Sequence, residues 1–252
     1  MRFDQKKILV TGGSRGIGRA IATRFAAAGA RVAIHYGSNH EAADVAIKNL
    51  EGTGHILCSG DVAEPETTQR IVRETVEKLG GLDVLVNNAG IFEAHPVDDV
   101  TFDDWQLAWQ QTLAVNLTGP ANLCWQAIDH MRHNGGGHII NVSSRGAFRG
   151  EPRCPAYGAS KAGLNAMTQS LAQHVAPYGI FVGAVAPGFV ETDMASKVLD
   201  GPDGDAVRQQ RPLGRVARTE EVAHAVLFLA SEGAEFSTGA IIDVNGASYL
   251  RS

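Results

Sequence analysis

The feature that most constrains this chain is an alternation, along almost its whole length, of short apolar runs with longer amphipathic stretches. Such an alternation is typical of repeated βαβ units, which build a mainly parallel sheet. The short runs are nearly continuous in apolar residues, as expected for strands that are covered by helices on both faces. The sequence therefore predicts an α/β fold with a doubly wound, parallel, seven-stranded sheet.

The expected elements follow from hydrophobic periodicity. We expect strands near residues 6–10, 31–36, 55–59, 84–87, 138–142, 180–185 and 240–244. We expect helices near residues 16–28, 40–50, 65–79, 102–133, 157–175 and 220–231. No repeat or linker divides the chain, so residues 1–252 are predicted to form one domain. The stretch 188–215 mixes glycines, prolines and charges, and it is predicted to be a substrate loop or lid.

Composition excludes several classes of protein. The formal net charge is −5 and the basic residues are scattered, which argues against a nucleic-acid partner. The three cysteines are widely separated, so neither a disulfide framework nor a metal or redox motif is expected. No segment approaches the roughly 18 uninterrupted apolar residues of a membrane span, and no signal peptide is recognised. We expect a cytoplasmic protein with no membrane contact and no metal site.

A glycine-rich turn follows the first predicted strand and opens the first predicted helix. It reads Thr-Gly-Gly-Ser-Arg-Gly-Ile-Gly from Thr11 to Gly18. Free backbone N–H groups and the positive end of the helix dipole point at one spot there, which makes an anion site that fits a dinucleotide pyrophosphate. The spacing GxxxGxG differs from the common GxGxxG fingerprint. A plain tight turn is the alternative, and the position between strand and helix favours cofactor binding.

The end of the second predicted strand bears on the choice of cofactor. An NAD-selective site usually offers a carboxylate there for the ribose 2′-hydroxyl, but this stretch reads His-Tyr-Gly-Ser-Asn from 35 to 39. Nothing repels a 2′-phosphate, and Arg15, Ser38 and Asn39 could donate hydrogen bonds to it. NADP(H) is the preferred cofactor, and NAD(H) remains possible, with Arg15 as a solvated loop charge.

A tyrosine and a lysine mark the predicted chemical centre. Tyr157 and Lys161 are spaced i, i+4, so they lie on one helix face within reach of a common group. The pKa of a free tyrosine lies near 10, and an adjacent ammonium together with a cationic nicotinamide would favour the phenolate. Lowering this pKa by about three units requires about 4 kcal/mol of differential stabilisation. The pair suggests general acid/base chemistry.

Six motifs in order make the sequence resemble the classical short-chain dehydrogenase/reductase family over essentially its whole length, most of all its 3-oxoacyl-acyl-carrier-protein reductases. They are TGxxxGxG at 11–18, Asn-Asn-Ala-Gly at 87–90, the helix asparagine Asn116, the serine Ser144, YxxxK at 157–161, and Pro187-Gly188 with Thr192. The resemblance implies a Rossmann-like fold and an oxidoreductase that transfers hydride between a nicotinamide and a carbonyl or secondary alcohol.

The resemblance also implies residue roles. Tyr157 would be the general acid/base, Lys161 would hold the nicotinamide ribose, Ser144 would bind the substrate oxygen, and Asn116 would position a water that relays protons. A helix-bending structural amide is the alternative reading of Asn116. Asp61 would contact the adenine, residues 88–90 the adenosine ribose, and Thr192 the carboxamide. The expected cofactor-binding set is Gly12, Ser14, Arg15, Gly16, Ile17, Gly18, Ser38, Asn39, Asp61, Val62, Asn88, Ala89, Gly90, Tyr157, Lys161, Pro187, Gly188, Val190 and Thr192.

Two departures separate this chain from the carrier-protein reductases that it resembles. Those enzymes can present arginines near the end of the long helix before the fifth strand and after the YxxxK helix, where this chain has Gly135 and Tyr178. The net charge of −5 also weakens attraction of an acidic carrier protein. We therefore expect a small-molecule substrate. Carrier-protein reduction is the first alternative, and a non-catalytic nicotinamide-binding regulator or scaffold is the second.

The substrate loops and the assembly are less constrained by the sequence. Residues 145–154 carry Arg145, Arg149, Glu151 and Arg153, which suggests a polar or anionic substrate or, equally, a solvated loop. His95 is a lone loop histidine that is expected at the surface. The helix at 102–133 carries more apolar surface than one sheet face covers, and the family resemblance implies a homotetramer.

Overall fold

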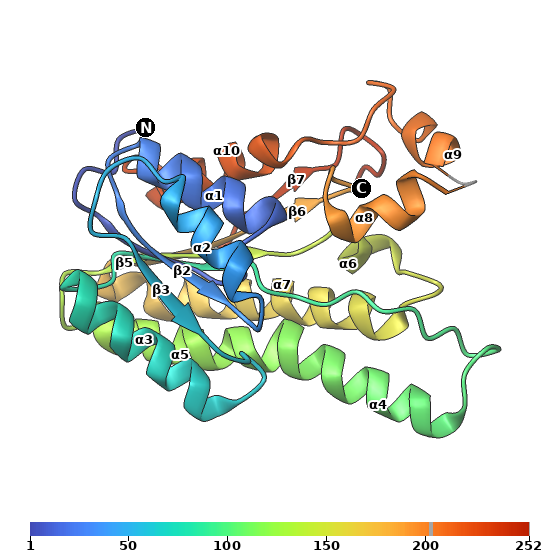
Figure 1. Ribbon diagram of the computed structural model, residues 1–252, viewed down its shortest axis with the longest axis horizontal. Coiled ribbons are helices and arrows are strands. Elements are labelled where there is room, and N and C mark those ends of the chain that lie inside the picture. Colours follow the sequence, from blue (N-terminus) through green and yellow to red (C-terminus); the bar gives the residue numbers. More distant parts are fainter. Residues whose placement is uncertain (202–203, 252) are drawn as a thin grey trace.

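A parallel sheet of seven strands forms the centre of the molecule, in the order β3-β2-β1-β4-β5-β6-β7 (Figure 1). The computed structural model describes residues 1–201 and 204–251, without the side chains of 194, 197 and 198. The strands are β1 (Lys7–Val10), β2 (Arg31–Tyr36), β3 (Ile56–Ser59), β4 (Val84–Asn87), β5 (Gly137–Val142), β6 (Ile180–Pro187) and β7 (Ile241–Val244). The predicted α/β fold and its seven strands are confirmed, with ends that differ by a residue or two.

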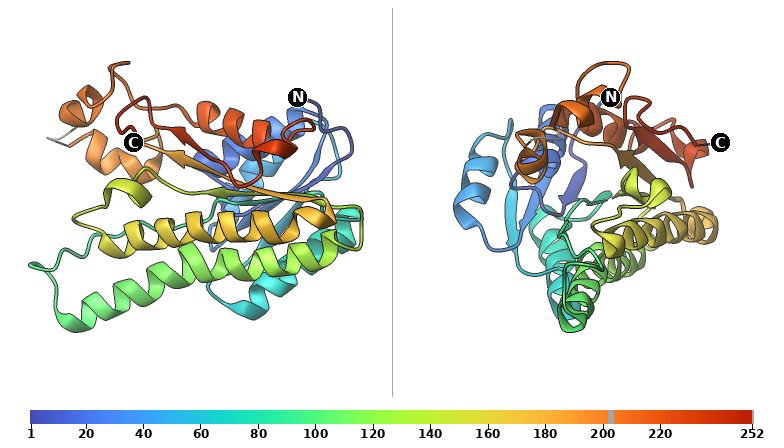
Figure 2. Two further views of the ribbon diagram at one scale, coloured as in Figure 1. Left: turned by 180° about the vertical axis from the view of Figure 1, so that it is seen from behind. Right: turned by 90° about the vertical axis from the view of Figure 1, so that its right-hand side faces the viewer.

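Two layers of helices cover the sheet (Figures 1 and 2). One layer holds α1 (Gly16–Ala27), α2 (His40–Lys48) and α10 (Thr219–Leu229), and the other holds α3 (Pro65–Leu79), α4 (Phe102–Leu113), α5 (Gly119–Met131) and α7 (Pro155–Val175). The strands alternate between the two cores: Ile8 and Val10 pack on the first layer, and Leu9 packs on the second. A strand buried on both faces is apolar at nearly every position, which explains the nearly continuous runs.

The long helix predicted at 102–133 is interrupted. Between α4 and α5 lies η1 (Ala114–Thr118), one turn of π-helix with Asn116 buried at its centre. A π-turn inserts one extra residue into the ladder and redirects a side chain, and hydrophobic periodicity alone does not reveal it. The prediction of an unbroken helix was therefore wrong at this turn.

Short helices occupy stretches that were expected to be loops. They are α6 (Gly146–Arg149), α8 (Asp193–Leu199) and α9 (Gly204–Gln209), and the 3-10 turns are η2 (Ala176–Tyr178) and η3 (Glu235–Ser237). The predicted lid at 188–215 thus contains two helices, because Ala195, Leu199, Val207 and Val216 form a small core of their own. Residues 202 and 203 of the predicted lid lie outside the described residues.

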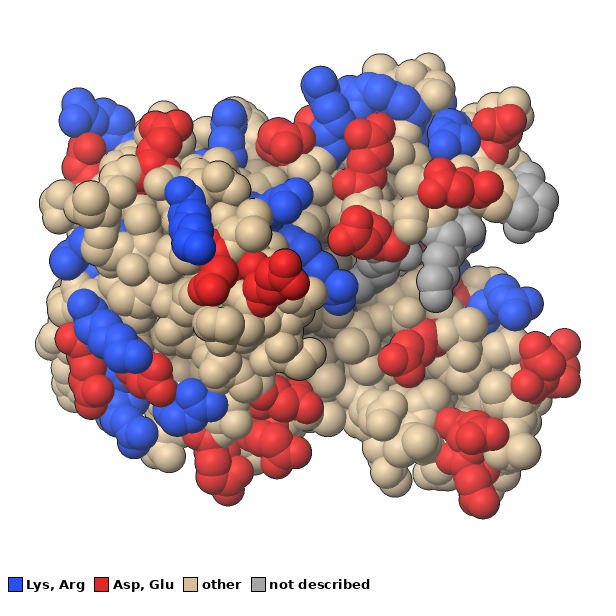
Figure 3. Space-filling model, in the orientation of Figure 1, with Lys and Arg blue, Asp and Glu red and all other residues tan. Residues whose placement is uncertain are grey.

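The strand order places a crevice at the carboxyl ends of the strands. The chain runs outward from β1 to β3 on one side and then restarts at β4 on the other side of β1. In open parallel sheets a ligand binds where the order reverses in this way. Figure 3 shows the surface hollowed on this side, between the segment that carries α8 and α9 and the N-terminal end of α4.

Candidate active site

The glycine-rich turn between β1 and α1 is built as an anion cradle. Gly12 and Gly16 have positive φ angles of 61° and 52°, a conformation that glycine adopts readily. A Cβ on Gly12 would lie 3.0 Å from the Cα of Ala89, so the turn packs directly on the backbone after β4. Arg15, the N-cap residue of α1, makes no side-chain cap. The first N–H groups of α1 therefore remain available for a phosphate, which fits a dinucleotide.

His35 supports this turn from beneath, a role that sequence reasoning missed. The side chain is 2% exposed, and its Nδ1 accepts a hydrogen bond from the Gly12 N–H at 3.2 Å. Its Nε2 lies 2.9 Å from the carbonyl oxygen of Gly60. Both contacts together require the neutral ring protonated on Nε2, and burial lowers the pKa of His35. The available signal was a histidine inside the otherwise apolar run of β2.

The turn after β4 is bound to the glycine-rich turn by hydrogen bonds. The Nδ2 group of Asn88 donates to the carbonyl oxygens of Thr11 and Gly12 at 2.9 and 3.2 Å. The Oγ1 atom of Thr11 accepts from the backbone N–H groups of Asn88 and Ala89 at 2.9 and 3.0 Å. The side chain of Asn88 thus holds the glycine-rich turn, and the backbone of Ala89 packs against Gly12.

The residues predicted to meet a 2′-phosphate lie at the surface. Arg15, Ser38 and Asn39 are exposed, the last two after β2. The Oδ1 atom of Asn39 caps α2 by accepting from the Ala42 N–H at 2.9 Å, which leaves its amide donor free. The exposed Asp61 uses Oδ1 to accept from the Ala63 N–H at 2.9 Å. These positions are compatible with binding the far half of a dinucleotide.

The chemical centre lies where α7 begins, against the end of β5. Tyr157 and Lys161 share one face of α7, and Lys161 Nζ lies 5.8 Å from the centroid of the Tyr157 ring. Lys161 Nζ donates to the Val142 carbonyl oxygen at 2.8 Å. The Ser144 hydroxyl accepts from the Gly146 N–H at 3.0 Å and lies close enough to the Tyr157 hydroxyl to lower its pKa. The structure therefore brings together three of the four predicted catalytic side chains.

Burial moves the two titratable groups in opposite directions. Burial raises the pKa of Tyr157 to about 12, although the ring keeps some exposed surface, and the Ser144 hydrogen bond opposes this. Burial lowers the pKa of Lys161 to about 8. The expected depression of the tyrosine pKa is therefore not achieved by the protein alone, because desolvation penalises the phenolate more than Ser144 favours it.

Asn116 positions backbone in the middle of the site. Its Oδ1 accepts from the Ile91 N–H at 2.8 Å, and its Nδ2 donates to the Ile91 carbonyl oxygen at 2.9 Å and the Ser160 hydroxyl at 3.3 Å. A Cβ on Gly90 would lie 3.1 Å from Asn116 Oδ1 and 3.6 Å from Lys161 Nζ, so Asn116 and Lys161 flank this glycine. The side chain thus holds the loop after β4 against α7.

The other predicted residues come from the loops after β3 and β6. Val62 is buried against the start of α5, where a Cβ on Gly119 would lie 2.5 Å from the Val62 carbonyl oxygen. Pro187 ends β6, and Gly188 follows it. Val190 pairs with Ala217 in an isolated bridge. A Cβ on Gly16 would lie 3.3 Å from the Thr192 methyl group, so the loop after β6 reaches the glycine-rich turn.

His95 is buried, so the expectation of a surface residue was wrong. It is 2% exposed, its Nδ1 bonds the Glu93 carbonyl oxygen at 2.9 Å, and its Nε2 accepts from the Ala156 N–H at 3.2 Å. Ala156 lies in the first turn of α7, next to Tyr157. His95 therefore caps the helix that carries Tyr157, a pairing across 61 positions that no local pattern reveals.

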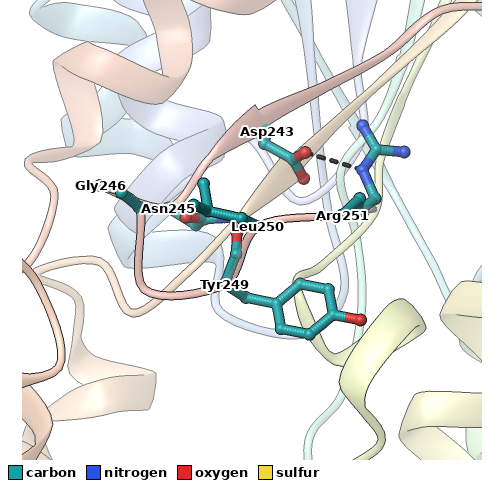
Figure 4. A pocket seen from close by; sticks show the side chains of 7 residues that line it. Asp243, Asn245, Gly246, Tyr249, Leu250 and Arg251 are labelled. Carbon is teal, nitrogen blue, oxygen red and sulfur yellow. Dashed lines mark hydrogen bonds and ion pairs between the residues drawn. The ribbon is translucent and has the colours of Figure 1, made fainter.

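A separate cavity of about 460 Å³ lies beside the C-terminal segment (Figure 4). It is lined by Asp243, Asn245, Gly246, Ala247, Tyr249, Leu250 and Arg251. None of the predicted catalytic residues lines it, so it does not define the active site. Within the described ranges, no helix is both long and apolar enough to cross a bilayer, and no cluster of three potential metal ligands occurs.

The fold and this site together define a dinucleotide-binding α/β oxidoreductase. Residues 12–247 match a family model described as enoyl-(acyl carrier protein) reductase. A 3-oxoacyl-[acyl-carrier-protein] reductase FabG from Aquifex aeolicus is 39% identical, covering 99% of both chains. An uncharacterized oxidoreductase from Thermotoga maritima is 38% identical, covering 98% of this chain and 99% of that one.

A solved structure agrees with these relatives. A short-chain dehydrogenase from Burkholderia cenocepacia J2315, crystallised in complex with NADP, superposes with a TM-score of 0.88 at 38% identity, covering 98% of this chain and 99% of the other. The chain belongs to the short-chain dehydrogenase/reductase family. It is accordingly an NAD(P)-dependent oxidoreductase, and the predicted family resemblance is confirmed.

Proposed function

We propose that this protein is an NADP(H)-dependent oxidoreductase that interconverts a carbonyl and a secondary alcohol on a small substrate, with Tyr157 as general acid/base. The observation that carries the proposal is the meeting of Tyr157, Lys161 and Ser144 at one end of α7. This end of α7 lies at the same edge of the sheet as the uncapped N-terminus of α1. An anion cradle and a proton donor thus share one crevice.

The ionisation of the side chains suits carbonyl reduction. A tyrosine whose pKa is about 12 is a neutral phenol at physiological pH, and this form can donate a proton to a carbonyl oxygen. Ser144, which lies close enough to the phenol to lower its pKa, is placed to orient the same oxygen. Bound NADPH supplies the hydride. Lys161, with a pKa of about 8, places a positive charge beside the phenolate that remains after proton transfer.

Preference for NADP(H) rests on the end of β2. Residues 35–39 contain no carboxylate to accept from a ribose 2′-hydroxyl or repel a 2′-phosphate, and Arg15, Ser38 and Asn39 are exposed nearby. The Burkholderia relative was crystallised with NADP. The Kd values of NADPH and NADH, measured by calorimetry, test this preference. Equal or tighter binding of NADH would refute it.

A carbonyl panel tests the activity. Oxidation of NADPH, followed by absorbance across small ketones, sugar-like carbonyls and acyl substrates, is the expected result. Cofactor binding without turnover of any substrate would favour a non-catalytic nicotinamide-binding regulator or scaffold. The intact set of Ser144, Tyr157 and Lys161 supports the enzyme.

Reduction of a 3-oxoacyl group on an acyl carrier protein is the second candidate, because relatives carry that name. Gly135 lies in a turn with a φ angle of 90°, and Tyr178 is 50% exposed. Neither supplies a positive charge for an acidic carrier. We expect free small substrates to be reduced at least as efficiently, by kcat/KM, as the same group on a carrier protein. The opposite order would favour the carrier-protein reductase.

We further propose a homotetramer in the cytoplasm. Phe102, Leu107 and Trp125 are 73%, 51% and 64% exposed on α4 and α5, an apolar face that association would cover. The small residues of α7 allow close approach of helices, as where Gly163 faces Leu117. Light scattering after size exclusion tests the assembly, and a monomer would refute it. The three cysteines are all free and buried, which suits a reducing compartment.

A further inference from the structure

Two buried arginines lie at the carboxyl ends of β5, β6 and β7, outside the residues already assigned. Arg145 directly follows Ser144, and Arg211 lies between α9 and α10; each is only 3% exposed. Their guanidinium carbons lie 5.7 and 5.6 Å from the centroid of the Phe189 ring. The ring of Phe189, in the loop after β6, thus makes cation–π contacts with both arginines.

Neither arginine is neutralised by the described part of the chain. The Nη1 group of Arg145 donates to the Ser248 hydroxyl at 2.8 Å and to Oε1 of Gln210 at 3.2 Å, both neutral acceptors. The Nη1 group of Arg211 donates to the Val207 carbonyl oxygen. No described carboxylate lies within 4.0 Å of either guanidinium. Burying a charge without a counter-charge is costly, so both arginines would be stabilised by binding an anion.

One hydrogen-bond donor in this cluster has no acceptor among the described residues. The Nη2 group of Arg211 is buried, and no polar atom of residues 1–201 or 204–251 accepts a hydrogen bond from it. It lies against Gly188, because a Cβ there would be 3.5 Å from it. Gly188 belongs to the loop predicted to contact the nicotinamide half of the cofactor. The unused donor therefore lies against the loop after β6, which borders the crevice where a substrate would bind.

Two other arginines, Arg215 and Arg251, differ from this pair because each donates hydrogen bonds to a carboxylate. Arg215 donates through Nη1 and Nη2 to the two carboxylate oxygens of Glu221 at 2.8 and 2.7 Å. Arg251 donates through Nε to Asp243 at 2.8 Å (Figure 4). Both are held by carboxylates near the surface, as is usual for arginines that serve packing. Arg145 and Arg211 differ in burial and in partners.

The pKa values of Arg145 and Arg211 are both lowered, as expected for buried arginines without a carboxylate partner. Burial lowers the pKa of Arg145 to about 10, and the nearby positive charges of Arg149 and Arg211 lower it further, while Glu151 opposes them. Burial and Arg149 also lower the pKa of Arg211. Like charges are thus held close together inside a protein whose net charge is −5. An anion bound between them would relieve that repulsion.

We propose that Arg145 and Arg211, held on Phe189, bind an oxyanion carried by the substrate, a carboxylate or a phosphate, while its carbonyl lies at Ser144 and Tyr157. The planar fork of a guanidinium group can donate two parallel hydrogen bonds to two oxygens of either a carboxylate or a phosphate. This inference rests on the proposed function and names its substrate class: a carbonyl compound with an anionic group.

Matched substrate pairs test this proposal. The pairs are a short oxo-carboxylate with its methyl ester, and dihydroxyacetone phosphate with dihydroxyacetone. For wild type, we expect kcat/KM with NADPH to favour the anionic member of at least one pair by about 10- to 100-fold, as expected for charge-assisted hydrogen bonds. The favoured pair distinguishes carboxylate from phosphate. Turnover of neutral members with no preference for an anion would overturn the inference and leave the proposed function standing.

Substitutions at Arg145 and Arg211 test whether these two residues cause the preference for anionic substrates. Arg145→Gln is expected to reduce the anionic-to-neutral ratio of kcat/KM at least tenfold. The matched control is Arg153→Gln, which removes an exposed arginine of the same loop and is expected to keep the wild-type ratio. Arg211→Lys retains the charge but loses the fork, so it should lower the ratio and still fold where Arg211→Gln does not. An unchanged ratio in Arg145→Gln and Arg211→Lys would overturn the proposal.

A binding measurement separates the inference from catalysis. Calorimetric titration of the favoured oxo-acid or phosphate into Tyr157→Phe protein loaded with NADP⁺ should give a Kd that rises at least tenfold when Arg145→Gln is added. Equal affinity with and without that second substitution would mean that the anion binds elsewhere.

Discussion

His35 provides the sharpest test of how this fold supports its cofactor cradle. The ring accepts the Gly12 N–H through Nδ1 and bonds the Gly60 carbonyl through Nε2, at 3.2 and 2.9 Å. His35→Leu places an apolar residue in the strand and leaves both backbone groups, the Gly12 N–H and the Gly60 carbonyl, unpaired. An unsatisfied buried group costs about 1–3 kcal/mol, and these sites are only partly buried, so a loss of about 2–4 kcal/mol is expected.

The expected loss is large enough for a thermal assay. For a chain of this size, about 1 kcal/mol shifts Tm by roughly 2–4 °C, so circular dichroism should show His35→Leu melting about 4–16 °C below wild type. The Kd for NADPH should rise, because Gly12 begins the turn that meets the pyrophosphate. His35→Asn keeps an acceptor near the position of Nδ1, and His35→Gln keeps a donor near Nε2. Asparagine is expected to preserve NADPH affinity better than glutamine.

The same residue makes stability depend on pH with a defined sign. Burial holds the pKa of folded His35 below its ordinary value of 6.5, so the unfolded chain binds more protons between those two values. The contribution of His35 is therefore complete above pH 6.5 and is lost as pH falls below it. The difference in unfolding free energy between wild type and His35→Asn, measured with urea, should shrink from about pH 8 to about pH 5.

Three results would refute this reasoning about His35. They are a wild-type Tm in His35→Leu, NADPH affinity that is equal in all three variants, and a free-energy difference that does not change with pH. His130 and His138 also have pKa values lowered by burial, so the comparison must be made between wild type and variant, where their contributions cancel.

Three further predictions follow from the site and from α10. Tyr157→Phe should lower kcat about 10²-fold or more while NADPH still binds, and retained kcat would mean that the proton comes from another group. Gly18→Ala should raise the NADPH Kd at least about tenfold and lower Tm, because its Cβ would overlap the Gly12 carbonyl and lie 2.5 Å from Asn88 Nδ2. Gly37→Ala, whose Cβ meets nothing within 4 Å, is the matched control and should melt like wild type. Glu221, whose pKa Arg215 lowers to about 2, stabilises the fold above its ordinary value of 4.5 and loses this effect as pH falls toward 2. Glu221→Gln should flatten the urea-unfolding stability over that range, and an unchanged slope would contradict the assignment.

The sequence alone determined the class of fold and much of the site. Continuous apolar runs predict strands covered on both faces, because burial on two sides favours apolar residues at nearly every position. The glycines of the turn at 11–18 are predictable because a positive φ and a close backbone approach both require them, as Gly12 shows. The i, i+4 spacing of Tyr157 and Lys161 places both on one face wherever α7 lies.

The tertiary structure decided what depends on partners distant in sequence. The π-turn around Asn116 depends on Ile91 and Ser160, and His95 caps α7 from the loop after β4. Arg211 faces Gly188 only because the segment between β6 and α10 folds over the carboxyl ends of the strands. Hydrophobic periodicity is a local signal that reports which face of an element is buried. It carries no information on which polar group will meet a buried histidine or arginine, because the packing of the whole chain sets that partner.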